Sequence, residues 1–451
     1  MTVERCPGET LRAALERTLR EAIRAGALRE GVRLPSSRAL AHELSVSRGV
    51  VSDAYAQLEA QGFLVTRARA APVVANVPRP ATVRRKPELK APAPRYDLAP
   101  TTPDVTLFPL NRWLAAAQQV ARRASTATLD YREPRGERAL REALADHLGR
   151  TRGVIAEPDQ IVVVQGTAQG VDLLLRLMLA RAAVRIAVED PSHTTQHERI
   201  RTLGFELGAQ PVDDKGMVVT GLDADAVLVT PAHQFPTGSV LSGERRRQLL
   251  AWSHASGGLI VEDDYDAEFR YDREPVRALQ GLAPEHVVQL GTVSKTLAPA
   301  LRLGWLVAPP RLADDASRSK RLLDDFSPAL DQLTLAELLR SGDYDRHIRR
   351  ARAAYRTRRD RLLAALAKHL PDLTIDGVAA GVHILLRLPA GTNDRTIAEV
   401  ANRAGIAVPP LSAFRIRPSA QGGLVIGYGR LHESAVEAAT RALAKLIQAH
   451  L

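Results

Sequence analysis

Cysteine is almost absent from this sequence: Cys6 is the one cysteine among 451 residues. The chain therefore has no internal disulfide bond and no zinc site built from several cysteines. No apolar run approaches the roughly 18 residues that a membrane-spanning helix requires. Residues 1–23 are amphipathic and of mixed charge, and they lack the apolar stretch of a signal peptide. We therefore expect a cytoplasmic protein without contact with a membrane.

Lysine is scarce as well, because arginine supplies most of the basic charge. The formal net charge is +11 and the pI is about 10.1, which favours polyanionic partners. An arginine-rich coding bias that leaves solvated basic faces would produce the same excess. The length and a hydrophobic content of 45% suit two or three domains with a large core. The lysines are Lys86, Lys90, Lys215, Lys295, Lys320, Lys368 and Lys445.

Residues 1–76 carry the pattern of a winged helix-turn-helix. Apolar residues recur at helical spacing in 9–26, and glycines end that segment. A second helix starts after Pro35, and a third follows the tight turn "SVS" and ends at Gly62. The segment "FLVTRARAAPVVA" is typical of two short strands around a turn. Three helices and a β-hairpin are the parts of that DNA-binding fold.

Arginine and serine residues lie where a helix-turn-helix contacts DNA. Helix N-termini offer N–H groups to phosphate, and arginine binds guanine edges with two hydrogen bonds. The alternative is a compact helical hairpin with surface arginines. The stretch 34–65 resembles the GntR family of bacterial regulators, whose form is "LPSSRxLAxxLxVSRxxVxxAYxxLexxGfl". The resemblance implies a double-stranded DNA operator and association with the nucleoid. The expected contacts are Arg33, Arg38, Ser47, Arg48, Arg67 and Arg69.

The wing and the segment after it differ from the rest of this unit. The wing tip of the GntR family is usually rich in glycine, whereas this chain has "TRARAAPVV", so we expect wing contacts from Arg67 and Arg69. Residues 77–96 are rich in proline and basic side chains, which stiffens the chain and opposes helix formation. We interpret 77–96 as an interdomain linker. Contact between this segment and DNA phosphates is a second possible role.

After residue 97 the pattern changes to alternating strands and helices. Short apolar runs of this kind suit strands buried on both faces of a mostly parallel sheet. The segment 330–370 is a long helical region, and "GVHILLRLP" and "GLVIGYG" are expected strands of a smaller α+β part. We therefore expect an α/β domain over 97–451. Its main strands are "QIVVVQG", "RIAVED", "DAVLVTP", "GLIVEDD", "HVVQLG" and "LGWLVAP".

Lys295 lies between Ser294 and Thr296 in "GTVSKTLAPALRLGW". A lone lysine is most often a surface charge. A lysine that forms a Schiff base instead needs a pocket and a phosphate anchor for an aldehyde cofactor. Hydroxyls and a guanidinium for that phosphate are close in sequence, and the turn in "VVVQGTAQGVDLLL" offers backbone N–H groups as a second cradle. The candidate phosphate ligands are Thr292, Ser294, Arg302, Gly166, Thr167 and Ala168.

Asp263 ends the expected strand "GLIVEDD", and Tyr265 follows two residues later. A carboxylate at such a place pairs with a protonated pyridine nitrogen, and a phenol bonds a ring oxygen. The alternative is that Asp263 caps a helix, while Glu262 and Asp264 are surface charges. All these polar turns follow the C-terminal ends of strands, where open α/β sheets bind ligands.

These residues together resemble the fold-type I aminotransferases, which use pyridoxal 5′-phosphate (PLP), over residues 97–451. With the GntR-like head, the whole chain resembles the MocR subfamily of GntR regulators, in which an aminotransferase-like domain serves as effector sensor. The resemblance implies that Lys295 is the Schiff-base lysine, that Asp263 pairs with the pyridine nitrogen, and that Tyr265 bonds the ring hydroxyl. It also implies a homodimer, because Tyr131 in "LDYREPRGERALREAL" matches a tyrosine that reaches the phosphate of the partner subunit's cofactor. The phosphate ligands implied are Arg302, Thr292, Ser294, Thr167 and Ala168.

Three positions depart from the aminotransferase pattern. His193 stands where the family usually stacks an aromatic ring on the cofactor, and Phe235 stands where true aminotransferases carry an asparagine. Val425 occupies the apparent place of the arginine that grips a substrate carboxylate. The nearby Arg415, Arg417 and Arg430 have no assigned role.

Three functional hypotheses follow. The first is a PLP-dependent transcription regulator whose sensor domain binds an amino compound or PLP itself, without efficient turnover. The second is an active aminotransferase that carries a DNA-binding head; Phe235 and Val425 argue against it. The third is a DNA-binding protein whose sensor has lost its cofactor; the retained Lys295, Asp263 and Tyr265 argue against it.

Overall fold

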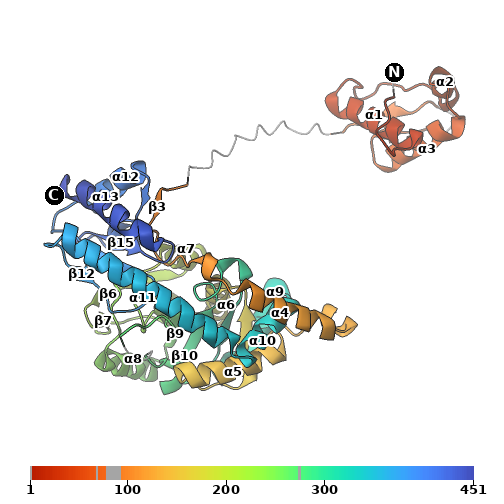
Figure 1. Cartoon of the computed structure of the whole chain (residues 1–451). Helices are drawn as coiled ribbons and strands as arrows, with labels where there is room; N and C mark the ends of the chain where they lie inside the picture. Colours follow the sequence, from red (N-terminus) through yellow and green to blue (C-terminus); the bar gives the residue numbers. More distant parts are fainter. Residues whose placement is uncertain (1–2, 68–69, 78–92, 273–275) are drawn as a thin grey trace. The chain divides into compact units, whose positions relative to one another are not determined.

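The computed structural model describes residues 3–67, 70–77, 93–272 and 276–451. The chain divides into two compact units, Met1–Ala91 and Pro92–Leu451, which Figure 1 traces along the sequence. Most of the expected linker, 77–96, lies outside the described residues. Tyr96, at the end of that segment, already belongs to a short strand, β3 (Tyr96–Asp97).

The N-terminal unit is the expected winged helix-turn-helix. Each of its helices begins with a hydroxyl side chain that accepts a hydrogen bond from the first turn, at Thr10, Ser36 and Ser47. The apolar faces of the helices meet in one buried core that includes Leu19 and Leu58. The two wing strands pair antiparallel, and Arg69 lies outside the described residues. The elements are α1 (Leu11–Ala25), α2 (Ser37–Glu43), α3 (Arg48–Ala60), β1 (Leu64–Val65) and β2 (Val73–Val74).

An eight-stranded sheet forms the centre of the second unit. Its order is β4-β11-β10-β9-β8-β5-β6-β7. The neighbours from β10 to β6 are parallel, whereas β11 is antiparallel to both β10 and β4. The strands are β4 (Ile161–Val164), β5 (Arg185–Asp190), β6 (Glu206–Asp213), β7 (Gly216–Met217), β8 (Ala226–Val229), β9 (Leu259–Asp264), β10 (Val287–Thr292) and β11 (Gly304–Val307).

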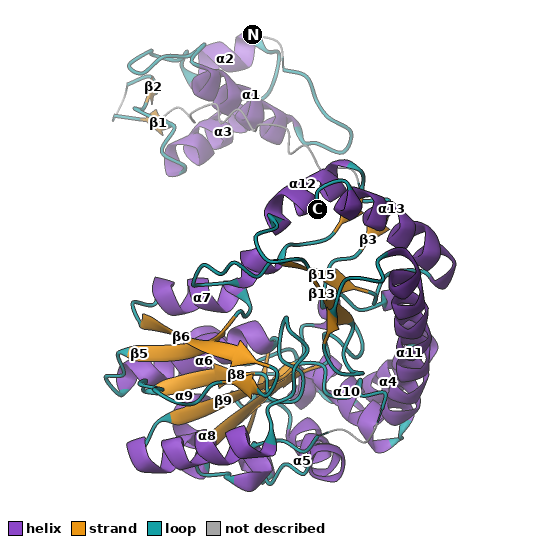
Figure 2. Ribbon diagram, turned by 90° about the vertical axis from the view of Figure 1, so that its left-hand side faces the viewer, coloured by secondary structure: helices purple, strands orange, loops and turns teal. Residues whose placement is uncertain are grey.

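Helices cover both faces of this sheet (Figure 2). Alternate residues of β4 show why its sequence is apolar throughout: Val162 and Val164 enter one hydrophobic cluster, and Ile161 and Val163 enter another. Full burial of each such side chain stabilises the fold by about 1.5–3 kcal/mol. The helices are α4 (Leu110–Arg123), α5 (Arg138–Arg152), α6 (Thr167–Ala180), α7 (Thr194–Thr202), α8 (Gly243–Ser256), α9 (Pro310–Asp324) and α10 (Ala329–Arg340).

The C-terminal part is smaller and α+β, as expected. A three-stranded antiparallel sheet, β12-β13-β15, packs against helices in a separate hydrophobic cluster. The long helical region is two helices, because Gly342 at φ 71° separates α10 from the next helix. β3 pairs in parallel with β14. The elements are α11 (Asp343–His369), β12 (Ile375–Asp376), β13 (His383–Arg387), α12 (Asp394–Arg403), β14 (Ile406–Ala407), β15 (Gly423–Gly427) and α13 (Val436–Gln448).

Short 3₁₀ turns connect many of these elements. None of the helices within the described residues combines the length and the hydropathy that a membrane span needs. The 3₁₀ turns are Val105–Leu107, Thr126–Leu129, Pro158–Gln160, Gln280–Leu282, Pro299–Leu301, Leu411–Phe414 and Glu433–Ala435.

Candidate functional site

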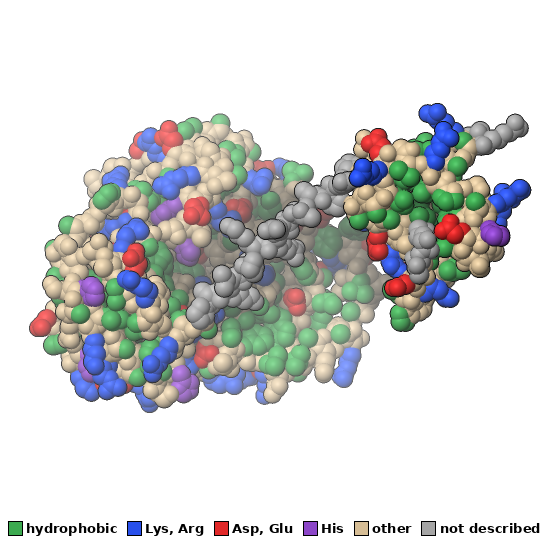
Figure 3. All heavy atoms as spheres, turned by 90° about the horizontal axis from the view of Figure 1, so that it is seen from above, with side chains coloured by type: hydrophobic (Ala, Val, Ile, Leu, Met, Phe, Trp, Pro, Cys, Tyr) green, Lys and Arg blue, Asp and Glu red, His purple; other side chains and the backbone are tan. Residues whose placement is uncertain are grey.

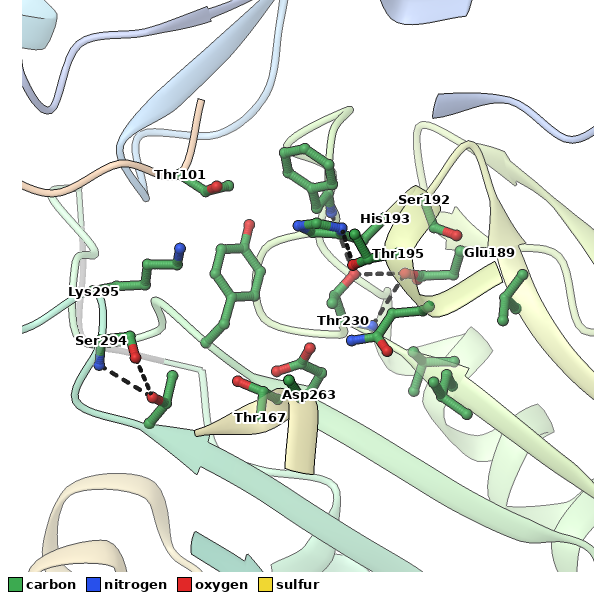
Figure 4. A pocket seen from close by; sticks show the side chains of 18 of the residues that line it. Thr101, Thr167, Glu189, Ser192, His193, Thr195, Thr230, Asp263, Ser294 and Lys295 are labelled. Carbon is green, nitrogen blue, oxygen red and sulfur yellow. Dashed lines mark hydrogen bonds between the residues drawn. The ribbon is translucent and has the colours of Figure 1, made fainter. Parts of the chain in front are cut away.

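One cavity of about 310 Å³ collects nearly all the residues expected to hold a cofactor. It opens at the C-terminal ends of β5, β8, β9 and β10, as the sequence predicted from the positions of the polar turns. Figure 4 shows side chains from these strand ends directed around one space. The predicted residues that line it are Thr167, Ala168, His193, Asp263, Tyr265, Thr292, Ser294, Lys295 and Arg302.

Lys295 follows β10 and projects into the cavity (Figure 4). Removal of its amine from water lowers the pKa of Lys295, while the charges of Asp266 and Asp263 oppose that shift. A lysine with a lowered pKa keeps more of its amine in the neutral, nucleophilic form. Burial lowers the pKa of Lys320 as well, but Lys295 is the lysine among the residues that line the cavity.

Asp263 is the penultimate residue of β9, and its Oδ1 atom is buried without a hydrogen-bond partner. Burial, reinforced by the charge of Asp264, raises the pKa of Asp263 to about 7. A buried carboxylate oxygen without a donor is costly, and a cationic N–H group placed against it would remove that cost. The chemistry of this carboxylate therefore fits a protonated pyridine nitrogen.

The neighbours of Asp263 are not the surface charges of the alternative interpretation. Glu262 is fully buried and accepts hydrogen bonds from the backbone N–H groups of Leu279 and Gln280. Asp264 is also buried and forms an ion pair with Arg152 at 2.8 Å. Strand alternation explains the difference, because Glu262 and Asp264 point away from the cavity that Asp263 faces.

The expected phosphate ligands lie together at one end of the cavity. Gly166 precedes α6 with φ 80°, and a Cβ on it would lie 3.2 Å from the Arg302 guanidinium, so a side chain would fill this cradle. Arg302 donates a hydrogen bond from Nη2 to the carbonyl of Gln165 at 2.5 Å. Thr292 Oγ1 accepts a hydrogen bond from the Ser294 N–H at 3.1 Å. Backbone donors, hydroxyls and a guanidinium at the N-terminus of a helix suit a phosphate dianion.

The opposite wall is aromatic and apolar. The rings of His193 and Phe235 lie 5.4 Å apart, centroid to centroid, with an interplanar angle of 34°. Desolvation, helped by the charge of Lys295, lowers the pKa of His193 and favours its neutral ring. Phe235 also packs edge-on against Phe414 and belongs to a cluster with Val425, which is fully buried. Val425, at the apparent place of a carboxylate-binding arginine, thus packs among aromatic and apolar side chains and does not itself line the cavity.

Tyr265 and Tyr131, the two tyrosines of the predicted set, lie in different surroundings. Tyr265 lines the cavity, and its hydroxyl lies 3.2 Å from both Nδ1 and the carbonyl oxygen of His233. Tyr131 does not line the cavity: its side chain is 86% exposed and packs edge-on against Phe326. Its expected reach toward a partner subunit stays a prediction.

Sequence reasoning missed a buried acid that lines the same cavity. Glu189 Oε2 accepts hydrogen bonds from the backbone and hydroxyl of Thr230 and from Gln234 Nε2. Burial raises the pKa of Glu189 to about 7. The signal was available, because Glu189 lies near the C-terminal end of the strand "RIAVED", at the same edge of the sheet as Asp263. Thr101 also lines the cavity, but it lies in a loop far away in the sequence, and no local pattern marked it as a cavity residue.

The expected DNA-contacting residues are exposed on the N-terminal unit. Ser47 caps α3, and Arg48 begins that helix with Nε 3.5 Å from the Ser37 hydroxyl. Arg33 pairs with Val73 of the wing through an isolated bridge. Figure 3 shows basic side chains, all of them arginines among the described residues, projecting from this unit. The exposed residues of the predicted set are Arg33, Arg38, Ser47, Arg48 and Arg67.

Comparisons with known proteins cover both units. Residues 11–74 match the family described as "Bacterial regulatory proteins, gntR family", and residues 100–442 match "Aminotransferase class I and II". The chain is 35% identical to the HTH-type pyridoxine biosynthesis transcriptional regulator PdxR of Corynebacterium glutamicum, over 92% of this chain and 91% of that protein. It is 32% identical to the probable rhizopine catabolism regulatory protein MocR of Rhizobium meliloti, over 91% and 88%.

The chain belongs to the MocR-type regulators of the GntR family.

The solved structures agree with this assignment for the second unit. An archaeal alanine:glyoxylate aminotransferase matches with a TM-score of 0.73 and 27% identity, over 79% of this chain and 91% of that one. The MocR-type relatives are HTH-type transcription regulators, so a regulator is favoured over an active aminotransferase. The GntR domain implies DNA as a partner, and the aminotransferase fold implies PLP as the cofactor of the family.

Proposed function

We propose that this MocR-type protein binds PLP in the cavity around Lys295 and couples the state of that cavity to operator binding by its winged heads. The observation that carries the proposal is the joint presence of Lys295, with its lowered pKa, and the unpartnered carboxylate oxygen of Asp263 in one cavity. A sensor that had lost its cofactor would have no physical reason to retain this costly pair.

Each wall of the cavity has a distinct task in this proposal. When bound, PLP supplies an aldehyde that a lysine amine attaches to and a ring that withdraws electrons. Lys295 provides the neutral amine, and Asp263 holds a proton at the pyridine nitrogen. Tyr265 donates its hydroxyl proton toward the ring oxygen, and His193 covers one face of the ring. The phosphate is held by the side chains of Arg302, Thr292 and Ser294 and by the N–H groups at Gly166, Thr167 and Ala168.

The effector is either PLP itself or an amino compound, and the cavity favours ligands without a second anionic group. Among the residues that line it, Lys295 supplies the amine and Arg302 the guanidinium, and in this proposal the cofactor engages both. Val425 leaves no cation at the apparent place of the arginine that grips a substrate carboxylate in an aminotransferase, and its neighbours in the cluster are apolar or aromatic. A buried carboxylate without a cation would lose its hydration uncompensated. The apolar wall therefore supports PLP or a carboxylate-free amine over an α-amino acid.

We further propose that the protein acts as a homodimer. Apolar side chains are exposed on α4, on the turn before Tyr131, on α10, which packs beside both, and on α9. A second copy on this surface would bury them and bring Tyr131 near the neighbouring cavity. Light scattering should give the mass of a dimer for the wild-type protein. For Leu129→Asp it should give a lower average mass at the same concentration, because the dimer dissociates more readily. The exposed side chains are Leu110, Leu114, Leu129, Tyr131, Leu322 and Leu330.

The test of the regulator proposal joins both units. DNA that binds the protein would be selected from a random library, and its affinity measured by fluorescence anisotropy with and without PLP. We expect PLP to change the affinity of wild type for the selected DNA, and Lys295→Ala to lose that response while it still binds DNA. An affinity that is indifferent to PLP, or a Lys295→Ala variant that responds like wild type, would refute the coupling.

A further inference from the structure

Two histidines and an aspartate are buried together behind Tyr265, and the proposed cofactor contacts use none of them. His233 lies in the turn after β8, Asp266 follows Tyr265, and His383 begins β13 of the C-terminal part. Their exposures are 2%, 2% and 1%. Side chains that ionise are rarely buried to this extent without a task in structure or chemistry.

The hydrogen bonds around His233 indicate which groups donate and which accept. Nδ1 of His233 lies 2.8 Å from Asp266 Oδ2, so the imidazole donates Nδ1–H to the carboxylate. The Tyr265 hydroxyl lies 3.2 Å from the same Nδ1 and 3.2 Å from the His233 carbonyl oxygen. Because Nδ1 of His233 carries a proton, the phenol oxygen of Tyr265 accepts at that contact. The hydroxyl proton of Tyr265 can therefore be donated to a different acceptor. In this structure the Tyr265 hydroxyl donates that proton to the His233 carbonyl oxygen. With PLP bound, the ring oxygen of the cofactor would compete for the same proton.

We infer that His233, oriented by Asp266, is a positioning residue that keeps the Tyr265 hydroxyl proton directed toward the cofactor. The inference rests on the proposed PLP site. His233 supports the phenol oxygen from behind, and Asp266 fixes the tautomer in which Nδ1 is the donor. Neither residue lines the cavity, so both act through Tyr265.

The groups around Tyr265 are consistent with a phenol that stays protonated. Burial, the charges of Asp266 and Asp263, and a side-chain hydrogen-bonding interaction with Asp266 raise the pKa of Tyr265 well above its ordinary value. On the other side of His233, burial lowers the pKa of His383 well below its ordinary value, so that ring is neutral. The two imidazole rings lie 4.8 Å apart, and a neutral His383 adds no charge that would compete with Asp266 for His233.

The C-terminal part also holds His233 in place sterically. Gly381 has φ 67°, and a Cβ on it would overlap Cε1 of His233 and lie 2.6 Å from Asp266 Oδ2. Its backbone therefore packs directly against the imidazole, and only glycine leaves room there. The backbone of the C-terminal part thus helps to fix the imidazole that contacts the Tyr265 hydroxyl.

The experiment measures PLP affinity and the pH at which the visible absorption of the bound cofactor changes. Tyr265→Phe removes the donated hydrogen bond, so affinity should fall about tenfold and the pH midpoint should rise by about one unit, since the ring oxygen becomes more basic. His233→Leu should move both quantities in the same direction. His233→Asn, which places an amide N–H near the former Nδ1, should recover part of each change.

A double-mutant cycle separates positioning from a general structural role. If His233 acts through Tyr265, His233→Leu should have no additional effect in a Tyr265→Phe background. His383→Leu is the matched control, because it removes a histidine of equal burial that makes no hydrogen bond to Tyr265, and its pH midpoint should equal that of wild type. Additive effects of His233→Leu and Tyr265→Phe, or a His233→Leu variant that titrates like wild type, would overturn the inference.

Two further outcomes have distinct meanings. The ligand atoms of His233, Asp266 and His383 lie within 4.8 Å of one another, a spacing that a metal ion could bridge. One equivalent of zinc in the purified protein, lost in both His233→Leu and His383→Leu, would replace positioning by a metal site. A wild-type protein that binds no PLP would refute the proposed function, and this inference with it.

Discussion

At the scale of single residues, the cavity gathers groups whose charged forms are disfavoured by burial. Lys295 has a lowered pKa, and Asp263 and Glu189 have raised ones. The sequence pointed to Lys295 and Asp263 through their neighbours, but it could not show that Asp263 Oδ1 lacks a partner. That fact depends on where side chains from four strands end, and it is the feature that fits a protonated ring nitrogen.

Lys295 is expected to be the point of covalent attachment. Borohydride reduction in the presence of PLP should fix the cofactor to the wild-type chain, and Lys295→Ala should abolish the attachment completely. Lys215→Ala, which changes a lysine outside the cavity, is the control and should label like wild type. Peptide mass spectrometry reads the result, and label on a lysine other than Lys295 would show that the site assignment is wrong.

Asp263 is expected to make the stability of the cofactor-free protein depend on pH. Its pKa rises from 3.8 to about 7 on folding, so between these values the folded state binds the proton that the unfolded state releases. The stability contributed by this group is complete below 3.8 and is lost as the pH rises through about 7. Asp263→Asn should therefore gain stability relative to wild type at about pH 8, and much less at about pH 4. Urea unfolding of the cofactor-free proteins at both pH values measures this, and an equal difference at both would contradict it.

At the scale of elements, periodicity identified six strands of the main sheet and missed the other two, the partly exposed β6 and the two-residue β7. The six apolar runs are all strands of the main sheet, whereas β6 alternates between exposed and partly buried residues and contains Pro211. Its place in the sheet follows from pairing with β5, which no local pattern reveals. The N-terminal helices were predictable because Thr10, Ser36 and Ser47 mark their starts.

Helix α3 carries the prediction for DNA binding. Arg48 is exposed at the start of this helix, so Arg48→Ala should weaken binding to the selected operator by about 1–3 kcal/mol. Arg12→Ala, on the exposed face of α1, is the control and should change specific binding little. Anisotropy titrations should also show affinity falling steeply with salt, since arginines neutralise phosphates. Operator affinity of Arg48→Ala equal to that of wild type would remove Arg48 from the contacting residues.

At the scale of the whole molecule, a DNA-binding unit and an aminotransferase fold share one chain, and the cavity shows which aminotransferase features are missing. Phe235 and Val425 belong to an apolar cluster that also contains Tyr265. In the proposed function the cavity holds the cofactor through Lys295 and Arg302, and Val425 stands at the apparent place of the arginine that would orient a substrate carboxylate. Binding without efficient chemistry is what a sensor requires.

The protein is expected to bind its effector without sustained transamination. Transamination needs the substrate held with its Cα–H bond perpendicular to the cofactor ring and next to a free lysine, and Val425 cannot fix that pose. The PLP-loaded protein would be mixed with a panel of amino acids and amines and with a keto acid acceptor, and product would be counted per site. We expect about one equivalent or less. Many equivalents per site would establish an aminotransferase that carries a DNA-binding head.

The sequence by itself determined the order of the two units, the helix-turn-helix, the main strands and the identity of Lys295, Asp263 and Arg302 as a set. These features could be predicted because helix caps, hydrophobic periodicity and the turns at strand ends depend on residues that are neighbours in the sequence. The tertiary structure alone decided which polar atoms stay without partners, that Glu262 and Asp264 are buried and paired, and that His383 packs against His233. These facts depend on contacts between residues far apart in the chain, whose distances are set only when the sheet and the C-terminal part pack together.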